Sequence, residues 1–450
     1  MTNSRTQIAV GTLLLLAAAA GTAPAQDAVA LTLGGAARLA AQWNAAPEAA
    51  RARVEQSQSR VRQRRAEFLP NFSIAASDVE RTLNTATFGF SFRDTGTGRF
   101  LFDPNGQVIG PVRTWDLRGT LQQRIFDFGS FARLRSAQAA VLASDADVSA
   151  VSQQASAAAA VAYVRALRAE AQMSARVADS TLADELLGTA RDMLAAGVGI
   201  ALDVTRARSQ VATARAQLIG ARNERNRARL DLQRAIGLPV GTEVRLADSL
   251  VAHPTDFAVP SEAHATEEAL RSRADLKLFD EQIKTSDRQA DAVRAERMPS
   301  LGLFAEQGAI GKGVDHLLPT YTWGISLTMP VFDGFRREGR LDEQRSTRKE
   351  LSVRKRDLAQ QAAADVRAAL LDLSSAREQF AANEERLMYA EQELVQSRDR
   401  FRAGVAGNAD VITASISLNA ARTQMVDARA AVLSARVALA RAQGIVAQLP

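Results

Sequence analysis

The chain has 450 residues, a formal net charge of +6 and no cysteine. The absence of cysteine excludes disulfides, thiol nucleophiles and cysteine zinc sites. Its three histidines, His253, His264 and His316, are far apart in the sequence. We therefore expect no metal site, no cofactor and no catalytic triad, which makes an enzyme the least favoured class.

The composition favours long helices packed in thin layers, because alanine is abundant and aromatic residues make up only 5% of the chain. Basic clusters at 60–65 and 222–229 raise the alternative of a helical nucleic-acid binder. Both clusters fall within helical patterns, and acidic residues are nearly as numerous as basic ones. We therefore interpret the clusters as solvated or membrane-proximal faces and expect no nucleic-acid partner.

The first 25 residues have the pattern of a signal peptide. Arg5 precedes an apolar stretch from Ile8 to Ala20, and Ala23-Pro24-Ala25 supplies a cleavage site. No later segment has the roughly 18 uncharged apolar residues that a transmembrane helix needs. We expect an exported protein without a helical anchor.

An internal repeat organises the remaining chain. Gly197-Val198 and Asp203-Val204 recur as Gly404-Val405 and Asp410-Val411, at a constant offset of 207 residues. This predicts a first repeat at 26–240, an equatorial linker at 241–265 and a second repeat at 266–450. Each repeat is expected to contain a helix, a β-hairpin and two long helices, with hairpins at 71–126 and 299–332 and long helices at 129–195, 201–236, 335–402 and 408–447.

The long helices have the heptad period of coiled coils. In the last of them, the heptad positions from Val411 to Val446 hold a large apolar residue and an alanine in turn. We call this row of residues the seam of the helix. The segment 129–195 contains no proline, and at about 1.5 Å per residue it would be roughly 100 Å long. Such a helix is too long for a compact domain and favours a structure that crosses a space.

The segments between the helices have the two-residue period of strands. Tyr321, Trp323, Ile325, Leu327 and Met329 alternate with small or polar residues, and similar runs predict strands at 71–93, 111–126, 299–308 and 320–332. The alternating runs themselves are about 9–11 residues long, the length that a tilted strand needs to cross a bilayer. Four strands cannot close a barrel, and open edges are not tolerated in lipid. Three copies would supply twelve strands.

Along its whole mature length the chain resembles the TolC-like outer membrane efflux proteins. The resemblance rests on the duplicated helix pairs, on the tip turns around Gly197 and Gly404, and on the joints between strands and helices. Those joints comprise Pro70, Phe126, Asp127, Gly129, Pro299, Phe332, Asp333 and Gly334.

The resemblance implies a mainly α fold with a membrane β-barrel portion. Long antiparallel coiled-coil helices would form a periplasmic α-barrel tunnel, and each protomer of a homotrimer would supply one third of a twelve-stranded barrel in outer-membrane lipid. The chain would be the passive exit duct of a tripartite efflux or type I secretion system. Its partners would be a periplasmic adaptor and an inner-membrane pump.

The resemblance also assigns roles to the two tips. The turns would contact the adaptor, through Gly197, Val198, Gly199, Gly404, Val405, Ala406 and Gly407. Asp410, with Thr413 and Asp203, would form the pore constriction, although Asp203 is equally well explained as a helix-start residue. Thr413 and Ala406 replace an aspartate and an arginine of the family's best-known member, which predicts a weaker carboxylate ring and no arginine lock.

A different class of function remains open at the level of sequence. An exported trimeric structural coiled coil, such as an adhesin stalk, would also have a signal peptide and long heptads. Such stalks usually carry one barrel segment at the C-terminus, whereas strands recur here in both halves. The position of the strands therefore favours the duct.

Overall fold

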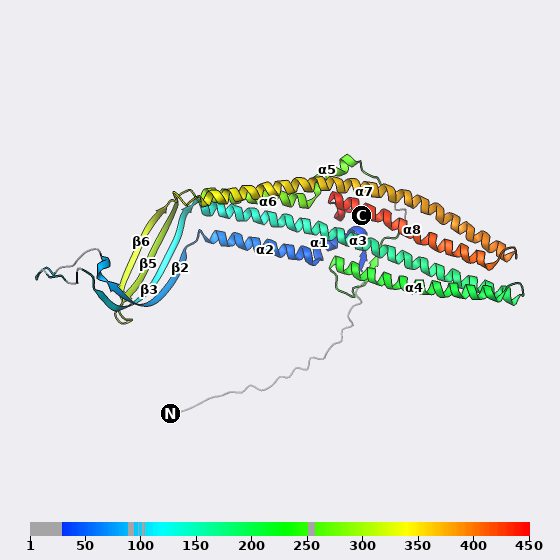
Figure 1. The fold of residues 1–450 in the computed structure, drawn as a ribbon, viewed down its shortest axis with the longest axis horizontal. Helices are drawn as coiled ribbons and strands as arrows, with labels where there is room; N and C mark the ends of the chain where they lie inside the picture. The colour runs from blue at the N-terminus through cyan, green and yellow to red at the C-terminus, as the bar shows by residue number, and fades with distance from the viewer. Residues whose placement is uncertain (1–28, 89–93, 98, 101–102, 104, 251–256) are drawn as a thin grey trace, which may run out of the picture.

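The computed structural model describes residues 29–88, 94–97, 99–100, 103, 105–250 and 257–450. The predicted signal peptide lies outside these residues. The molecule is elongated, with a four-stranded sheet at one end from which antiparallel helices run along the length (Figure 1). The elements are β1 (Val29–Leu31), α1 (Leu33–Trp43), α2 (Ala45–Ala66), β2 (Asn71–Asn84), η1 (Thr85–Phe88), β3 (Val108–Asp127), α3 (Phe128–Ala195), α4 (Ala201–Ile236), β4 (Val244–Leu246), α5 (Glu262–Ser272), α6 (Ala274–Ala295), β5 (Ser300–Gly311), β6 (Leu318–Thr328), α7 (Arg336–Arg402), α8 (Asn408–Gln443) and η2 (Val446–Gln448).

Two helices, α3 and α7, run the full length of the helical part (Figure 1). Beside them, α2 and α6 occupy the half next to the sheet, and α4 and α8 occupy the distal half. In the distal half α7 packs on α8, α8 on α3, and α3 on α4, so α7 and α4 form the two outer edges of this layer. With 68 residues, α3 is about 100 Å long.

The heptad seam of α8 is the packed face of that helix. All its positions are buried, and large residues alternate with alanine as the sequence predicted: Val411, Ala414, Leu418, Ala421, Met425, Ala428, Val432, Ala435, Leu439 and Ala442. Burying Leu418 or Met425 contributes roughly 1.5–3 kcal/mol each. The matching seam of α4 is less continuous, because Leu218, Ala221 and Arg225 are only half-buried.

The sheet is antiparallel throughout and has the order β2-β3-β5-β6. Phe72 lies opposite Leu121, and Leu303 opposite Ile325. The outer edges of β2 and β6 are unpaired within the part of the chain that the structure describes. The apolar residues Tyr321, Trp323, Ile325 and Leu327 of β6 are each more than 60% exposed. An open edge beside exposed apolar side chains calls for a partner strand.

The first strand is shorter than the sequence predicted. It ends at Asn84, and Phe88 lies in the 3₁₀ turn η1 instead of continuing the strand to residue 93. The Asn84 side-chain oxygen accepts a hydrogen bond from Ala86 N (3.1 Å). The backbone carbonyl of Asn84 accepts another from Thr87 Oγ1 (2.7 Å). This local turn competes with the sheet ladder and ends the strand. Phe90 and Phe92 of the predicted run lie outside the described residues.

The helix before each hairpin is also divided, where the sequence predicted one helix. Asn44 has extended backbone angles between α1 and α2, its side chain accepts a hydrogen bond from Ala46 N (2.9 Å), and it donates one to Ala235 O (2.9 Å). Asn44 therefore starts α2 and at the same time attaches this break to the end of α4. An extended Arg273 also separates α5 from α6, but its side chain does not cap the second helix.

A small layer packs against the middle of α3. The parallel strands β1 and β4, with α1 and the C-terminus, pack on α3 around the fully buried Tyr163. The Gly34 amide donates to Pro450 O (2.9 Å), and a side chain at position 34 would collide with the Leu449 carbonyl. We call this layer of β1, β4 and α1 the belt. It anchors both ends of the described chain to the longest helix.

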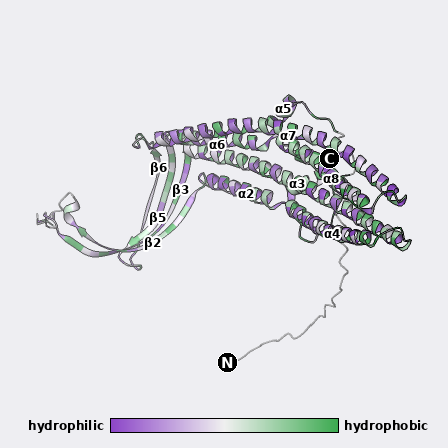
Figure 2. Ribbon diagram, turned by 45° about the vertical axis from the view of Figure 1, so that its right-hand side comes forward, coloured by the Kyte–Doolittle hydropathy of each residue, from purple (hydrophilic) through white to green (hydrophobic). Residues whose placement is uncertain are grey.

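Hydrophobic and hydrophilic residues alternate along the helices and the strands (Figure 2). Among the helices that the structure describes, none combines the length and the apolar composition needed to span a membrane.

Candidate functional site

The two distal tips have the same backbone design. Val198 N donates to Met193 O and Gly197 N to Leu194 O, each at 3.1 Å. At the other tip Val405 N donates to Arg400 O and Gly404 N to Phe401 O, each at 3.0 Å. These pairs are Schellman motifs, which end a helix with a residue in the left-handed region.

Glycine is required at both turns for its conformation. Gly197 has φ +77° and Gly404 has φ +73°, and no atom would obstruct a Cβ at either position. Gly199 is needed for another reason, since a Cβ there would lie 2.9 Å from Leu194 N. The turns leave Val198 and Val405 about 70% exposed at the end of the molecule. Ala406 is half-buried, and Gly407 precedes α8 in an extended conformation.

The predicted constriction residues lie just behind these turns. Asp203 is in the first turn of α4 and Asp410 in the first turn of α8. A carboxylate is favourable there because the helix N-terminus carries a partial positive charge. Thr413 is exposed one turn after Asp410, and its hydroxyl donates to Ala409 O (2.9 Å). Asp410 and Thr413 thus share one face of α8.

A residue that the sequence did not single out joins the two tips. Asn408 is 1% exposed, and its Nδ2 donates to the Asp203 carbonyl (3.2 Å). The residue at the matching position of the first repeat is Ala201. The two repeats therefore differ in residue type at the position that makes this contact. The contact sets the spacing between the starts of α4 and α8.

A second cluster that the sequence analysis did not find lies further from the tips, between α3 and α8. Asp179 of α3 is 1% exposed, with Arg176 Nη1 at 3.1 Å and Arg422 Nη1 of α8 at 3.3 Å. Burial raises the pKa of Asp179 above its ordinary value, and this effect outweighs the two arginines. With its amide nitrogen turned inward, Asn419 donates to Asp179 Oδ1 at 2.7 Å. The cluster holds α3 against α8.

The joints between sheet and helices are closed by matching ion pairs. Glu67 follows α2, and its Oε2 lies 3.0 Å from Arg133 Nη2 of α3. Glu296 follows α6 and makes two contacts with Arg340 of α7, at 2.7 and 3.0 Å. In both repeats the glutamate stands three residues before the proline that precedes the strand, Pro70 or Pro299. Each pair therefore fixes the point at which a hairpin leaves the helical layer.

The predicted joint residues lie at these points, with one difference between the repeats. Asp127 caps α3 by accepting a hydrogen bond from the buried Gly129 amide (2.8 Å). Asp333 does not cap α7. It pairs with the buried Arg337 (2.8 Å), and Gly334 (φ +69°) leads into α7. Phe126 and Phe332 each make an edge-to-face contact with a neighbouring phenylalanine.

The electrostatics of Glu67 are those of a structural carboxylate. Burial acts to raise its pKa, but hydrogen bonds from Arg64, Ser130 and Arg133 outweigh that effect and leave the pKa below its ordinary value. Glu67 is therefore charged at neutral pH and contributes to the joint in that form.

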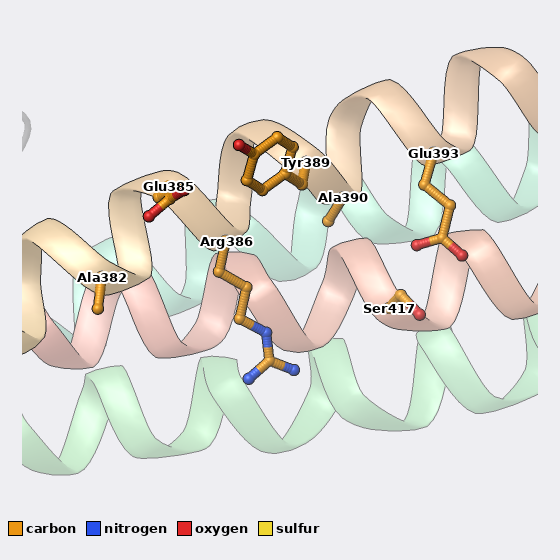
Figure 3. Close-up of a pocket in the computed structure, with 7 residues that line it drawn as sticks. All are labelled: Ala382, Glu385, Arg386, Tyr389, Ala390, Glu393 and Ser417. Carbon is orange, nitrogen blue, oxygen red and sulfur yellow. The ribbon is translucent and has the colours of Figure 1, made fainter.

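A groove of about 580 Å³ follows the outer edge of the distal layer, between α7 and α8. Glu385, Tyr389 and Glu393 line it from α7, and Ser417 from α8 (Figure 3). Arg386 extends over α8, where it donates to Gln424. The groove presents acidic and aromatic groups on a side of the layer where no further helix of the described chain packs.

The arrangement of long antiparallel helices with a four-stranded sheet at one end has counterparts among solved structures. The crystal structure of the outer membrane protein VceC from Vibrio cholerae superimposes with a TM-score of 0.68, at 19% identity, covering 92% of this chain and 96% of that one. The chain matches the outer membrane efflux protein family over residues 37–238 and 265–445 and belongs to that family. Members of that family are efflux proteins of the outer membrane.

Two relatives of known role come from Pseudomonas aeruginosa. The pyoverdine export outer membrane protein OpmQ is 27% identical over 321 residues, which cover 70% of this chain and 66% of OpmQ. The alkaline protease secretion protein AprF is 24% identical over 316 residues, covering 69% of this chain and 65% of AprF. The similarity thus spans about two thirds of the length of each relative.

Proposed function

We propose that the chain is the exit duct of a tripartite efflux or type I secretion system, which passively conducts substrates from a periplasm-spanning pump assembly to the exterior. The observation that carries the proposal is a sheet with two open edges at the end of a helical layer about 100 Å long. One relative is a pyoverdine export protein and another an alkaline protease secretion protein. Both names describe passage out of the cell, which supports a conduit without specifying a cargo.

The duct is a homotrimer in this proposal. The open edge of β6 pairs with β2 of the next copy, and three copies close a twelve-stranded barrel. Closure satisfies the edge hydrogen bonds that lipid cannot satisfy. It also turns the exposed Tyr321, Trp323, Ile325 and Leu327 of β6 toward the membrane as one apolar face. The helices continue the cylinder as a tunnel through the periplasm.

Charge complementarity supports this head-to-tail closure of the helices. The outer helix α4 carries eight arginines and three acidic residues. On the opposite edge, residues 378–399 of α7 include six exposed acidic residues and two arginines. Residues 378–399 end near one tip and α4 begins at the other, so the two segments lie at the same level when α7 of one copy meets α4 of the next. Complementary surfaces of this kind fix register and suppress wrong pairings.

The two halves of the chain are copies of one unit in this account. In the first pair α3 has 68 residues and α4 has 36, and in the second α7 has 67 and α8 has 36. Both tips are Schellman turns, and both joints carry a glutamate–arginine pair. Duplication gives a trimer six similar units, which is how three chains can line one round tunnel.

The tips are the contact surface for a periplasmic adaptor, which connects the duct to an inner-membrane pump. Val198 and Val405 are exposed apolar side chains at the end of otherwise charged helices. Gly197 and Gly404 of the adjacent turns are exposed and have no side chain, which leaves their backbone accessible to a partner chain. Behind them Asp410, with Thr413 and Asp203, forms the constriction, where carboxylates repeated by threefold symmetry would favour cations.

Conductance in planar lipid bilayers tests the proposal. The purified full chain should insert and give stepwise currents of uniform size. An exported structural coiled coil would give no steps, and that result would reject the duct. Removing the sheet edge by a proline at Tyr321 should abolish insertion, because proline lacks the ladder donor. The same substitution at the exposed Ala409, in the first turn of α8, should be tolerated, because no amide of the first turn donates within the helix.

A further inference from the structure

A pocket of about 420 Å³ opens beside the belt, where α3, α4, α8 and the segment that follows β4 meet. Three arginines line it, each from a different element: Arg229 from α4, Arg245 from β4 and Arg429 from α8. Leu167, Leu250 and Val426 form its apolar wall. We call this space the belt pocket.

The acidic groups of the belt pocket already have partners. Glu170 Oε2 lies 2.8 Å from Arg229 Nη2. Asp248 Oδ2 accepts hydrogen bonds from Leu33 N (2.8 Å) and from the Tyr163 hydroxyl (2.9 Å). Glu170 thus joins α3 to α4, and Asp248 joins the belt to α3. They leave the other two arginines without a counter-charge.

Arg245 and Arg429 make no hydrogen bond or ion pair with any described residue. Arg429 is half-buried, and its Nε is fully covered yet has no acceptor among the described residues. The Nε of Arg229 is in the same situation. A buried donor without an acceptor is costly, so such groups usually mark a missing partner.

We propose that the belt pocket binds an oxyanion, with its oxygens on Arg429 and Arg245. A guanidinium presents parallel N–H donors that match the two oxygens of a carboxylate or of a phosphate. The apolar wall of Leu167, Leu250 and Val426 leaves room for a small organic body behind the charged group. Bound there, the anion connects α8 to the belt and so braces the two helix pairs at mid-length. This site is independent of the proposed transport function.

The probes are inorganic phosphate and acetate, each titrated into the purified full chain in detergent, with chloride holding the ionic strength constant. Thermal unfolding should show a saturable rise in Tm with at least one probe, since a ligand that binds only the folded state stabilises it. A stronger response to phosphate identifies a phosphate-type ligand, and a stronger response to acetate a carboxylate. Calorimetric titration gives the affinity.

Arg429→Gln should weaken the affinity about tenfold or more, since it removes a charge-assisted contact. Arg245→Gln alters an exposed side chain and should act in the same direction even if the first variant folds poorly. The matched control is Arg356→Gln, an exposed residue of α7 outside the pocket. The proposal is overturned if neither probe gives a saturable response beyond chloride. It is also overturned if both pocket variants bind like the unchanged protein, or if the control loses binding equally.

Discussion

Asp179 and Arg422 are 243 residues apart in sequence, yet the carboxylate Oδ1 of one lies 3.3 Å from Nη1 of the other. The pair joins α3, which is packed along α4, to α8, which is packed along α7. It is therefore a buried polar bridge between two helix pairs that also meet through Asn408 and through the exposed pair Arg168–Asp427. Arg176 and Asn419 complete the shell of donors around the buried carboxylate.

A double-mutant cycle measures the strength of this bridge. Asp179→Asn and Arg422→Gln should be non-additive, with a coupling of at least about 1 kcal/mol, because the carboxylate is buried. The comparison pair is Asp184 and Arg215, which join α3 to α4 at 3.2 Å but are largely exposed. Its coupling should be below about 0.5 kcal/mol. Equal couplings in unfolding measurements would contradict a special role for Asp179.

The joint around Glu67 should be sensitive to acid. The folded-state pKa of Glu67 lies below its ordinary value of 4.5, so its contribution is present above that pH and is lost as the pH falls through the lowered value. At pH 7 Glu67→Gln should reduce the free energy of unfolding by roughly 1–2 kcal/mol. The difference from the unchanged protein should vanish in strong acid. Glu55→Gln, at an exposed position of α2, should have no effect at either pH.

Two glycine-to-alanine changes should have opposite signs. Gly404→Ala places a Cβ at φ +73° and should destabilise the tip by about 1 kcal/mol. Gly188→Ala lies within α3, where nothing approaches within 4 Å, and should stabilise the protein by about 0.5–1 kcal/mol. Hydrogen exchange at the tips, read alongside Tm, checks both. A neutral Gly404→Ala would show that the turn tolerates other conformations.

Reversing charges on one outer helix should weaken the proposed trimer. Glu385→Arg with Glu393→Arg places like charges opposite α4 of the next copy, at a cost of several kcal/mol. Mass photometry should show loss of trimer at low ionic strength and partial recovery at 1 M salt, where the Debye length is about 3 Å. Adding Arg208→Glu and Arg215→Glu should restore assembly. Failure of this rescue would reject the α7–α4 contact.

Ion selectivity tests the role of Asp410. In planar bilayers Asp410→Asn should shift the reversal potential in a salt gradient toward lower cation preference, because a symmetry-related set of carboxylates is lost at once. Asp372→Asn, an exposed change in α7 far from the tip, serves as the control. Unchanged selectivity in Asp410→Asn would place the constriction elsewhere.

The features that repeat along the sequence could be predicted from it. The alternation of alanine with large residues from Val411 to Ala442 marks the buried seam of α8, and a period of two marks β6. The Gly197 and Gly404 turns are visible because only glycine readily adopts their backbone angles. The pairs Glu67–Arg133 and Glu296–Arg340 beside Pro70 and Pro299 become evident only in the structure.

The features that depend on how distant segments meet could not be predicted. Nothing in the sequence separates Asp179 from the exposed Asp184 of the same helix, because its burial depends on the contact between α3 and α8. Each strand of the belt, β1 and β4, has three residues, too few to show a period. Asn408 is an exception, because it is polar while the matching residue of the first repeat is Ala201.

Single-particle cryo-EM of the detergent-extracted protein tests the central claim most directly. The account predicts a hollow threefold cylinder in which β6 of each copy pairs with β2 of the next, above a helical tunnel about 100 Å long. In that map α7 should face α4 of the neighbouring copy, and Asp410 should point toward the axis. A monomer, or a solid bundle without a lumen, would contradict the account.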